Sequence, residues 1–151
     1  MKEYKSESIR NVALVSHSGA GKTILGEALL FFTGANNRMG KIEDGSTVSD
    51  FDDEEQRRNI SIYTSVLPIE YKDSKINLLD TPGYTDFLGE EISALRVSDA
   101  AIIMVDAVAG VEVGTELAWQ YAGESKLPRF VLINKMDREN ANFQKMVAAV
   151  Q

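Results

Sequence analysis

Val12 to Thr23 reads VALVSHSGAGKT: an apolar run, a loop of small residues, and then Gly21-Lys22-Thr23 at the start of a predicted helix. This order of strand, loop and helix is that of a phosphate-binding P-loop. Successive backbone N–H groups in such a loop, together with the helix N-terminus, offer an anion several donors. The match is incomplete because Ser16 stands where the motif has its first glycine. A glycine-rich turn also serves as a simple connector, so the other motifs of the chain decide between these interpretations.

The residues of this loop are typical of a phosphate site. We expect Lys22 to reach the β- and γ-phosphates of a nucleotide, and the Thr23 hydroxyl to bind Mg²⁺. Lys22 is therefore also a candidate catalytic residue. The expected nucleotide-binding residues of the loop are Ser18, Gly19, Ala20, Gly21, Lys22, Thr23 and Ile24.

Composition narrows the class of protein. At 151 residues the chain has the size of one domain, with ordinary globular proportions of 44% hydrophobic and 26% charged residues. It has no cysteine and one histidine, which excludes disulfides and metal sites built from thiolates or several histidines. The net charge of −7 argues against direct binding of nucleic acid by this chain. The longest apolar run, 100–105, is too short to span a bilayer and the N-terminus is polar, so we expect a cytoplasmic protein without membrane contact.

Hydrophobic periodicity predicts strands that alternate with helices. Such an alternation predicts a mainly parallel sheet covered on both faces. A four-residue gap between two strand-like runs, 60–70 and 75–79, indicates one antiparallel hairpin. The expected strands are 9–16, 60–70, 75–79, 100–105 and 129–133, and the expected helices are 21–32, 85–97, 111–123 and a last one from about 139.

The two C-terminal helices carry apolar residues at helical spacing. In the helix 111–123 we expect Val113, Leu117 and Tyr121 to point inward. Trp119 lies off that face, which leaves it at the core edge or against a partner. In the last helix, the expected inner face is Phe143, Met146, Val147 and Val150.

Residues 35–58 show no sustained hydrophobic period, and 50–58 (DFDDEEQRR) is dense in charge. A loop of this length within a compact domain is usually functional or disordered. Two interpretations stay open. The segment is either a solvated loop, or a mobile segment that becomes ordered when a nucleotide binds.

Three polar motifs start where predicted strands end, after Val15, Leu79 and Ile133. Ligands bind at the carboxyl ends of the strands in such sheets, so we expect these loops to meet at one rim.

Two aspartates close similar apolar runs, Asp80 after INLL and Asp106 after IIMV. Either could hold Mg²⁺, directly or through water. We favour Asp80, because the Thr81-Pro82-Gly83 that follows it contains a glycine that lets a backbone N–H approach a terminal phosphate. Asp106 is expected to cap or orient a loop.

Asn134, Lys135 and Asp137 are the candidates for contact with a base. Guanine presents two adjacent donors, and one ionised carboxylate, that of Asp137, can accept both. Adenine lacks this pair of donors, so the carboxylate selects guanine. The aliphatic stem of Lys135 can cover the ring system. The alternative is a polar turn before a helix.

The motifs SHSGAGKT, RRNISI, DTPGY, GVEVGTELAWQYA and INKMDRENANF follow one another along the chain. In this order, and over essentially the whole chain, they resemble the GTP-binding domain of the translation elongation factor G family, most closely its elongation factor G-like group. Tetracycline-resistance ribosomal protection proteins are similar at a greater distance. The resemblance implies an α/β P-loop NTPase fold of the Ras-like GTPase type, with a mostly parallel sheet and one antiparallel strand. It implies GTP or GDP and Mg²⁺ as ligands, and the ribosome as the partner of the full-length protein.

The same resemblance implies two switches, about 35–61 and 80–97, beside the P-loop at 16–23 and the guanine motif at 134–137. Ser61 stands in the place of the family's switch threonine and Asn59 in the place of a glycine. A serine hydroxyl can still bind Mg²⁺, so Ser61 joins Thr23 as an expected ligand. Tyr84 replaces the histidine that positions the attacking water, and is the candidate for that catalytic role here. Tyrosine cannot match the protonation behaviour of histidine near neutral pH.

Two further positions complete the comparison with the family. Gly19 stands where the family has an aspartate, which puts a monovalent-cation site in question. His17 matches the P-loop histidine of the family and is expected to be structural.

The resemblance further implies that the domain continues past this sequence, with another strand and a base-contacting loop. We therefore expect a fragment truncated at its C-terminal end, in which the strand 129–133 becomes an exposed sheet edge.

The leading hypothesis is a GTPase whose hydrolysis switches the 35–61 segment. The alternative is a module that senses GTP, GDP or a guanine alarmone with little hydrolysis of its own. A fragment with an empty P-loop is a third hypothesis. A P-loop ATPase or kinase is a fourth, and the guanine motif disfavours it.

Overall fold

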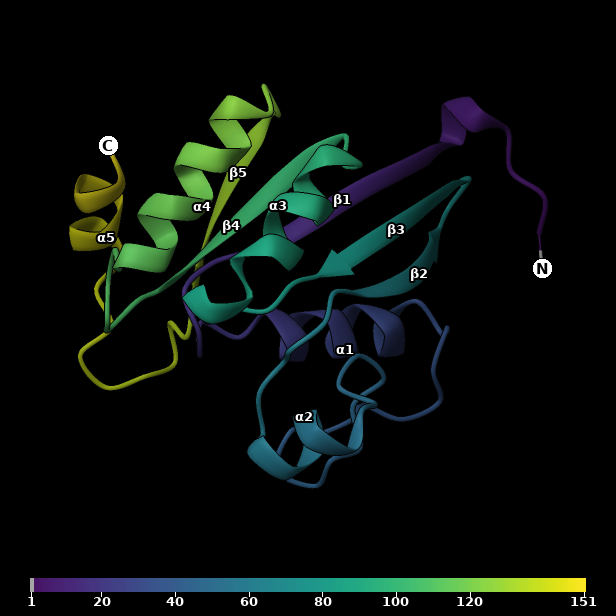
Figure 1. Ribbon diagram of the computed structural model, residues 1–151, viewed down its shortest axis with the longest axis horizontal. Helices are drawn as coiled ribbons and strands as arrows, with labels where there is room; N and C mark the ends of the chain where they lie inside the picture. The colour runs from purple at the N-terminus through teal and green to yellow at the C-terminus, as the bar shows by residue number, and fades with distance from the viewer. Residues whose placement is uncertain (1) are drawn as a thin grey trace.

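The computed structural model describes residues 2–151 as a twisted five-stranded sheet with helices on both faces (Figure 1). The strands are β1 (Ile9–Val15), β2 (Ser65–Tyr71), β3 (Ser74–Asp80), β4 (Ala100–Asp106) and β5 (Arg129–Asn134). The α-helices are α1 (Lys22–Phe32), α2 (Asp53–Arg58), α3 (Leu88–Arg96), α4 (Val113–Glu124) and α5 (Phe143–Val150), with 3₁₀ turns η1 (Ser6–Ser8) and η2 (Thr85–Phe87).

The strand order is β2-β3-β1-β4-β5. β1 runs parallel to β3 and β4, and β4 runs parallel to β5, whereas β2 pairs antiparallel with β3. The hairpin turn opposes Tyr71 to Ser74. The predicted α/β fold, with a mostly parallel sheet and one antiparallel strand, is therefore confirmed.

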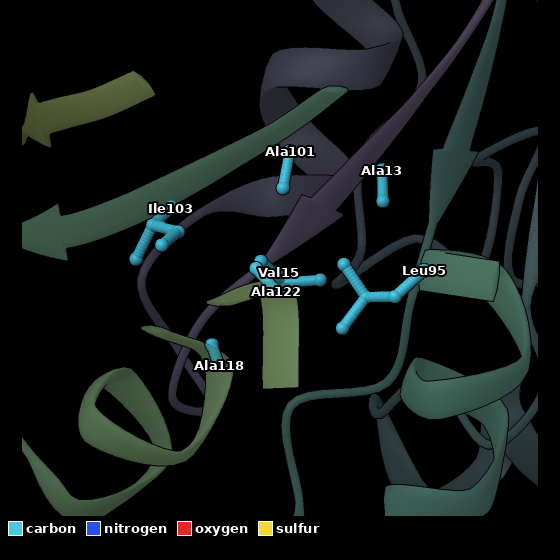
Figure 2. Packing of buried hydrophobic residues seen from close by; sticks show 7 residues of the cluster. All are labelled: Ala13, Val15, Leu95, Ala101, Ile103, Ala118 and Ala122. Carbon is cyan, nitrogen blue, oxygen red and sulfur yellow. The ribbon is translucent and has the colours of Figure 1, made fainter. Parts of the chain in front are cut away.

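Alternate residues of β1 fill two separate core layers, because successive side chains of a strand point to opposite faces. Leu14 faces α1, where Leu30 of that helix and Leu78 of β3 pack against it. Ala13 and Val15 face the opposite helices, α3 and α4. Figure 2 shows this second layer, which contains Ala13, Val15, Leu95, Ala101, Ile103, Ala118 and Ala122. The sheet is thus covered on both faces, as predicted.

The inner face of α4 differs in part from the prediction: Tyr121 packs against the core as expected, but Val113 does not. Val113 is 64% exposed, and the face that packs on the sheet is made of small residues. These buried residues are Gly114, Thr115, Ala118 and Ala122. A Cβ on Gly114 would lie 2.8 Å from the Cα of His17, so only glycine lets α4 come this close to the loop after β1. Packing distance, rather than side-chain hydrophobicity, decides which face turns inward.

Trp119 lies at the margin of the core, 44% exposed, with the Arg129 guanidinium 3.8 Å from its ring centroid. The same Arg129 donates a hydrogen bond to the Trp119 carbonyl at 3.1 Å. The core-edge interpretation of Trp119 is therefore the one that the fold supports.

Two predicted boundaries were wrong. The strand expected from residue 60 begins only at Ser65, because the N–H groups just before it donate to the carboxylates of Glu55 and Glu90 instead of to a neighbouring strand. The helix expected from about 139 begins at Phe143, because Asn142 caps its N-terminus by accepting from Lys145 N at 2.9 Å.

The charge-dense run is more than a solvated loop. Residues 53–58 form α2, which starts with a reciprocal capping box between Asp52 and Glu55. Glu55 is fully buried. Asn59 ends the helix with φ +55°, a conformation that asparagine tolerates nearly as well as glycine. The solvated-loop interpretation is therefore wrong for this part of the segment.

β5 is an edge strand, as predicted, with one neighbour in the sheet and Phe130 63% exposed. α5 packs beside β4, where Met146 is buried against Val105. Phe143, expected on the inner face of α5, is 51% exposed. Among the helices of residues 2–151, none is both long and apolar enough to cross a membrane.

Candidate functional site

The loop between β1 and α1 has a backbone that glycine makes possible. Gly19 has φ +77° and Gly21 has φ +101°, both in the left-handed region that favours glycine. A Cβ on Gly21 would also lie 2.5 Å from Asn134 Nδ2. The loop therefore turns tightly into α1, where no side chain of the N-cap satisfies the first N–H groups of that helix.

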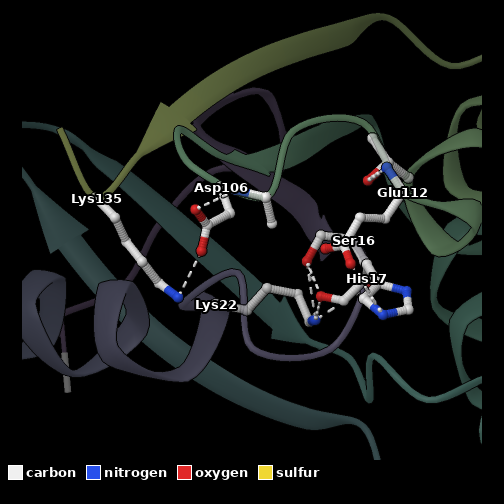
Figure 3. A network of polar contacts seen from close by, with 8 residues as sticks. Ser16, His17, Lys22, Asp106, Glu112 and Lys135 are labelled. Atoms are coloured by element: carbon white, nitrogen blue, oxygen red, sulfur yellow. Dashed lines mark hydrogen bonds and ion pairs between the residues drawn. The ribbon is translucent and has the colours of Figure 1, made fainter. Parts of the chain in front are cut away.

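Lys22 is 6% exposed and folds back over the loop (Figure 3). Its Nζ donates to Ser16 Oγ at 3.0 Å and lies 3.4 Å and 3.5 Å from the carbonyls of Ser16 and His17. Burial lowers the pKa of Lys22, and the nearby carboxylates of Asp80, Glu91 and Asp50 act in the opposite direction. The P-loop backbone thus holds the Lys22 ammonium in a position where it can also contact a bound anion.

Three hydroxyl and carboxyl groups meet beside this lysine, from α1, from the segment before β2, and from the end of β3. Thr23 donates to Asp80 Oδ2 at 2.8 Å, and its hydroxyl lies 3.3 Å from that of Ser61. Ser61 in turn donates to Asp50 Oδ1 at 2.7 Å. The structure therefore brings together all three residues that were predicted to bind Mg²⁺.

Asp50 was missed by the sequence analysis. It is 5% exposed although it lies within the charge-dense run, where a solvated aspartate is the ordinary expectation. The only signal was its place eleven residues before Ser61, and spacing within an irregular segment does not predict a contact.

The electrostatics of this cluster suit a divalent cation. Burial raises the pKa of Asp80 to about 6 and also raises the pKa of Asp50. Asp80 Oδ1 is buried without a hydrogen-bond partner. Carboxylate and hydroxyl oxygens are ligands that Mg²⁺ accepts, and an ion there would satisfy the orphaned oxygen. Within residues 2–151 no group of three or more histidine, cysteine, aspartate or glutamate side chains could hold a metal, so a cation bound here would also need the hydroxyls of Thr23 and Ser61 and the oxygens of a ligand.

A cavity of about 280 Å³ opens beside the cluster. Its volume is close to the lower end of the range of about 300–1,000 Å³ that is typical of ligand pockets. It is lined from four segments of the chain: by Ser18, Gly19, Gly21, Lys22, Thr23 and Ile24, by Ile42, Glu43, Asp50, Asn59 and Ser61, by Tyr84 after β3, and by Lys135 and Arg138 after β5. The predicted meeting of the loops at one rim is confirmed.

Gly83 lies where a side chain has no room. A Cβ there would be 2.7 Å from Lys22 Nζ and 2.7 Å from the backbone of Ser18. Thr81 fixes this loop by donating to the Leu14 carbonyl at 2.6 Å. The next residue, Tyr84, is 45% exposed at the rim of the cavity.

The loop after β5 is tied to the P-loop and to the loop after β4. Asn134 donates to the Ala20 carbonyl at 2.8 Å. Lys135 Nζ lies 2.7 Å from Asp106 Oδ2, as Figure 3 shows. Burial acts to raise the pKa of Asp106, but Lys135 and two backbone N–H groups lower it overall.

Asp106 also caps its own loop, since its Oδ1 accepts from the N–H groups of Val108 and Ala109. The loop-orienting role predicted for this aspartate is confirmed.

Not every predicted residue lines the cavity. Asp137 is exposed and stands outside it, and Ala20 is buried with its carbonyl already engaged by Asn134. A second, more open pocket of about 370 Å³ shares Lys135 and Arg138 with the first. The two pockets together run from the P-loop to the loop after β5.

His17 is placed as a structural residue. Its Nε2 lies 3.6 Å from Glu112 Oε1, and the backbone of Gly114 packs against its ring. Neither contact faces the cavity beside the P-loop.

The strand β1, the loop that ends at Lys22 and the helix α1 define a P-loop α/β domain. The model of the elongation factor Tu GTP binding domain matches residues 7–151. The chain belongs to this family.

Two relatives and one solved structure are similar to this chain over most of its length. The mitochondrial ribosome-releasing factor 2 of Lodderomyces elongisporus is 43% identical over 141 residues, which cover 93% of this chain and 17% of that protein. Elongation factor G 2 of Hahella chejuensis is 42% identical over 147 residues, covering 97% and 22%. A crystal structure of a Thermus thermophilus protein matches with a TM-score of 0.91 and 44% identity, over 93% of this chain and 21% of that one. The chain thus spans about a fifth of the length of these relatives.

Proposed function

We propose that this chain binds GTP and GDP with Mg²⁺ and hydrolyses GTP, as the N-terminal part of the GTP-binding domain of an elongation factor G-like protein that acts on the ribosome. One observation carries the proposal: Lys22, Thr23 and Ser61 line one cavity, and Asp80, at the end of β3, accepts a hydrogen bond from Thr23 beside it. The family of the chain and the names of its relatives support the ribosomal partner.

The chain's own groups divide the work on the phosphates. The first N–H groups of α1 and the ammonium of Lys22 bind the β- and γ-phosphates. Gly83 lets its backbone come close to the terminal phosphate, because any side chain there would meet Lys22. Mg²⁺, when bound by Thr23, Ser61 and Asp80, would neutralise charge on the same phosphates. Tyr84, at the rim, holds the attacking water through its hydroxyl, which can donate and accept one hydrogen bond.

The base lies toward the second pocket. Lys135 covers the ring with its aliphatic stem, and Asp106 holds the Lys135 ammonium in place. Asp137 accepts the two guanine donors from the rim of this region, and Asn134 ties the same loop to the P-loop. Base and phosphate recognition are therefore mechanically linked.

Calorimetric titration with GTP, GDP, ATP and xanthine nucleotides in Mg²⁺ buffer tests this function. The unchanged chain should bind the guanine nucleotides and not ATP. Asp137→Asn should lose guanine binding and gain xanthine binding, because the asparagine amide can donate to the 2-oxygen that xanthine carries in place of the 2-amino group of guanine. Asp73→Asn, at the exposed turn between β2 and β3, is the matched control and should behave like the unchanged chain. Binding of ATP as strong as that of GTP would refute the base assignment.

The proposed compartment is the cytoplasm. The absence of cysteine fits a reducing environment. Because one relative is mitochondrial, fractionation of cells that carry the tagged full-length protein is the direct test, and recovery with mitochondria would overturn this assignment.

A further inference from the structure

Glu27 is fully buried in the middle of α1, yet it serves no partner within its own helix. Its Oε2 accepts from the N–H of Gly40 at 2.8 Å, and its Oε1 accepts from the N–H of Val48 at 2.6 Å. Both donors belong to the segment between α1 and β2. One carboxylate thus binds this segment at two points eight residues apart.

The first of these contacts is built for close approach. A Cβ on Gly40 would lie 2.7 Å from Glu27 Oε2 and 2.5 Å from the Ser46 carbonyl. Between the two anchors the chain closes on itself, with Ser46 N donating to the Lys41 carbonyl at 3.1 Å and Lys41 N to Ser46 Oγ at 3.0 Å. The stretch 40–48 is therefore a closed loop whose two ends rest on Glu27.

This closed loop carries residues of the nucleotide cavity. Ile42 and Glu43 form part of its wall. Two residues after Val48 comes Asp50, which accepts from Ser61, and Ser61 in turn meets Thr23. The position of the Asp50–Ser61 pair over the P-loop therefore depends on where Glu27 holds the chain.

Glu27 also has a fixed relation to the phosphate site, because it lies one helical turn after Thr23 on the same side of α1. A movement of the start of α1 is passed to the segment through two buried hydrogen bonds. On the other side of Ser61, Glu55 accepts from Ile62 N at 2.8 Å and from Tyr63 N at 3.1 Å, so the serine lies between two anchored stretches.

We propose that Glu27 is a positioning residue that holds the 40–48 loop closed over the phosphate site and so sets the preference of the protein for a nucleoside triphosphate over the diphosphate. The inference rests on the proposed function. Only a triphosphate carries the γ-phosphate that the Ser61 side of the cavity would contact, so loss of the anchor affects the triphosphate selectively.

The test uses Glu27→Gln, which keeps the side-chain volume but sets an amide NH₂ against a backbone N–H. Gly40→Ala breaks the same contact from the other partner. Glu116→Gln, on the exposed face of α4, is the control. Two measurements are made: amide hydrogen exchange without nucleotide, and affinity for GDP and for the non-hydrolysable analogue GppNHp.

Both variants should speed exchange of the 40 and 48 amides at least tenfold while the sheet amides stay unchanged. Both should weaken GppNHp binding at least tenfold and leave GDP binding within twofold. Equal loss of both affinities would show that Glu27 merely supports the fold of α1, and unchanged exchange would show that it anchors nothing; either overturns the proposal.

If the unchanged chain binds neither nucleotide, the proposed function fails, and the triphosphate preference with it. Exchange measured without ligand then still reports separately whether the two anchors exist.

Discussion

Asn134 donates its side-chain amide to the carbonyl of Ala20 across 2.8 Å, although 114 residues separate them in the chain. The same amide nitrogen lies 2.5 Å from the position that a Cβ on Gly21 would take. The loop after β5 and the P-loop therefore fit together as one piece. A substitution in either loop should therefore affect both base binding and phosphate binding.

Asn134→Asp should weaken guanine-nucleotide binding at least tenfold, because the carboxylate would face the Ala20 carbonyl instead of donating to it. We also expect a loss of about 1–3 kcal/mol in the free energy of unfolding, since the carbonyl loses its partner. Calorimetry and urea denaturation measure the two effects. Asn142→Asp is the control, because aspartate caps a helix as well as asparagine does. Unchanged affinity in Asn134→Asp would contradict the link between the two loops.

Glu91 predicts a pH dependence of stability. It is 5% exposed with Oε1 unpartnered, burial raises its pKa to about 7, and Lys22 is the charged group that opposes the rise. Between its ordinary pKa and 7 the folded chain binds more protons than the unfolded chain, so the free energy of unfolding falls as the pH rises. The shift corresponds to a loss on the order of 3 kcal/mol for this group between pH 4.5 and pH 7.5.

Urea denaturation at pH 5 and pH 7.5 checks this expectation in the unchanged chain and in Glu91→Gln. The variant should lose much less stability between the two pH values, because glutamine does not titrate. Asp80 has a raised pKa and contributes a fall of the same sign in both proteins, so the difference between them reports Glu91. Identical pH profiles would show that Glu91 is not the titrating group.

Substitutions at Tyr84 test its proposed role in GTP hydrolysis. Tyr84→His should raise single-turnover GTP hydrolysis about tenfold with little change in affinity, because imidazole changes its protonation near neutral pH and a phenol does not. Tyr84→Phe should lower the rate, since it removes the hydroxyl that is proposed to hold the attacking water. Tyr71→Phe, at the far hairpin, serves as the control. A rate in Tyr84→Phe equal to that of the unchanged chain would remove the hydroxyl from the mechanism.

From the packing of the inner face of α4 we predict different effects of two substitutions: adding atoms at Ala118 should cost stability, and removing atoms at Val113 should not. Ala118→Leu should lower the free energy of unfolding by about 1–3 kcal/mol, because the added atoms have no space between α4 and the sheet. Val113→Ala should change it by less than about 0.5 kcal/mol, because the valine is mostly exposed. Urea denaturation of both variants measures this, and the reverse order would place Val113 in the core.

The strands and the meeting of three loops could be predicted from the sequence, because buried strands are short apolar runs and parallel strands end at one rim. The inner face of α4 could not be predicted. It is made of Gly114, Thr115, Ala118 and Ala122, whose advantage is small size, and a count of large apolar residues favours Val113 instead.

The ordered structure of residues 35–64 could also not be predicted from the sequence. Its anchors are bonds from backbone N–H groups to the buried carboxylates of Glu27 and Glu55 and to the half-buried carboxylate of Glu90. Every residue but proline has such an N–H, so the donors carry no sequence signal. The acceptors are glutamates, which ordinarily indicate a solvent-exposed surface. The cluster of Thr23, Ser61 and Asp80, in contrast, was predictable, because their motifs assigned roles to Thr23 and Asp80 and the resemblance to the family assigned one to Ser61.

The stacking of Arg129 on Trp119 gives the protein a built-in optical probe. Trp119 is the only tryptophan in the sequence, and it lies on the α4–β5 side, outside the lining of the cavity beside the P-loop. Separation of α4 from the edge strand would move the Arg129 guanidinium off the Trp119 ring, so we expect such a separation to change the indole emission. A fluorescent nucleotide would therefore report ligand occupancy, while the native indole reports the integrity of the α4–β5 edge, and both signals can be recorded in one cuvette without labelling the chain.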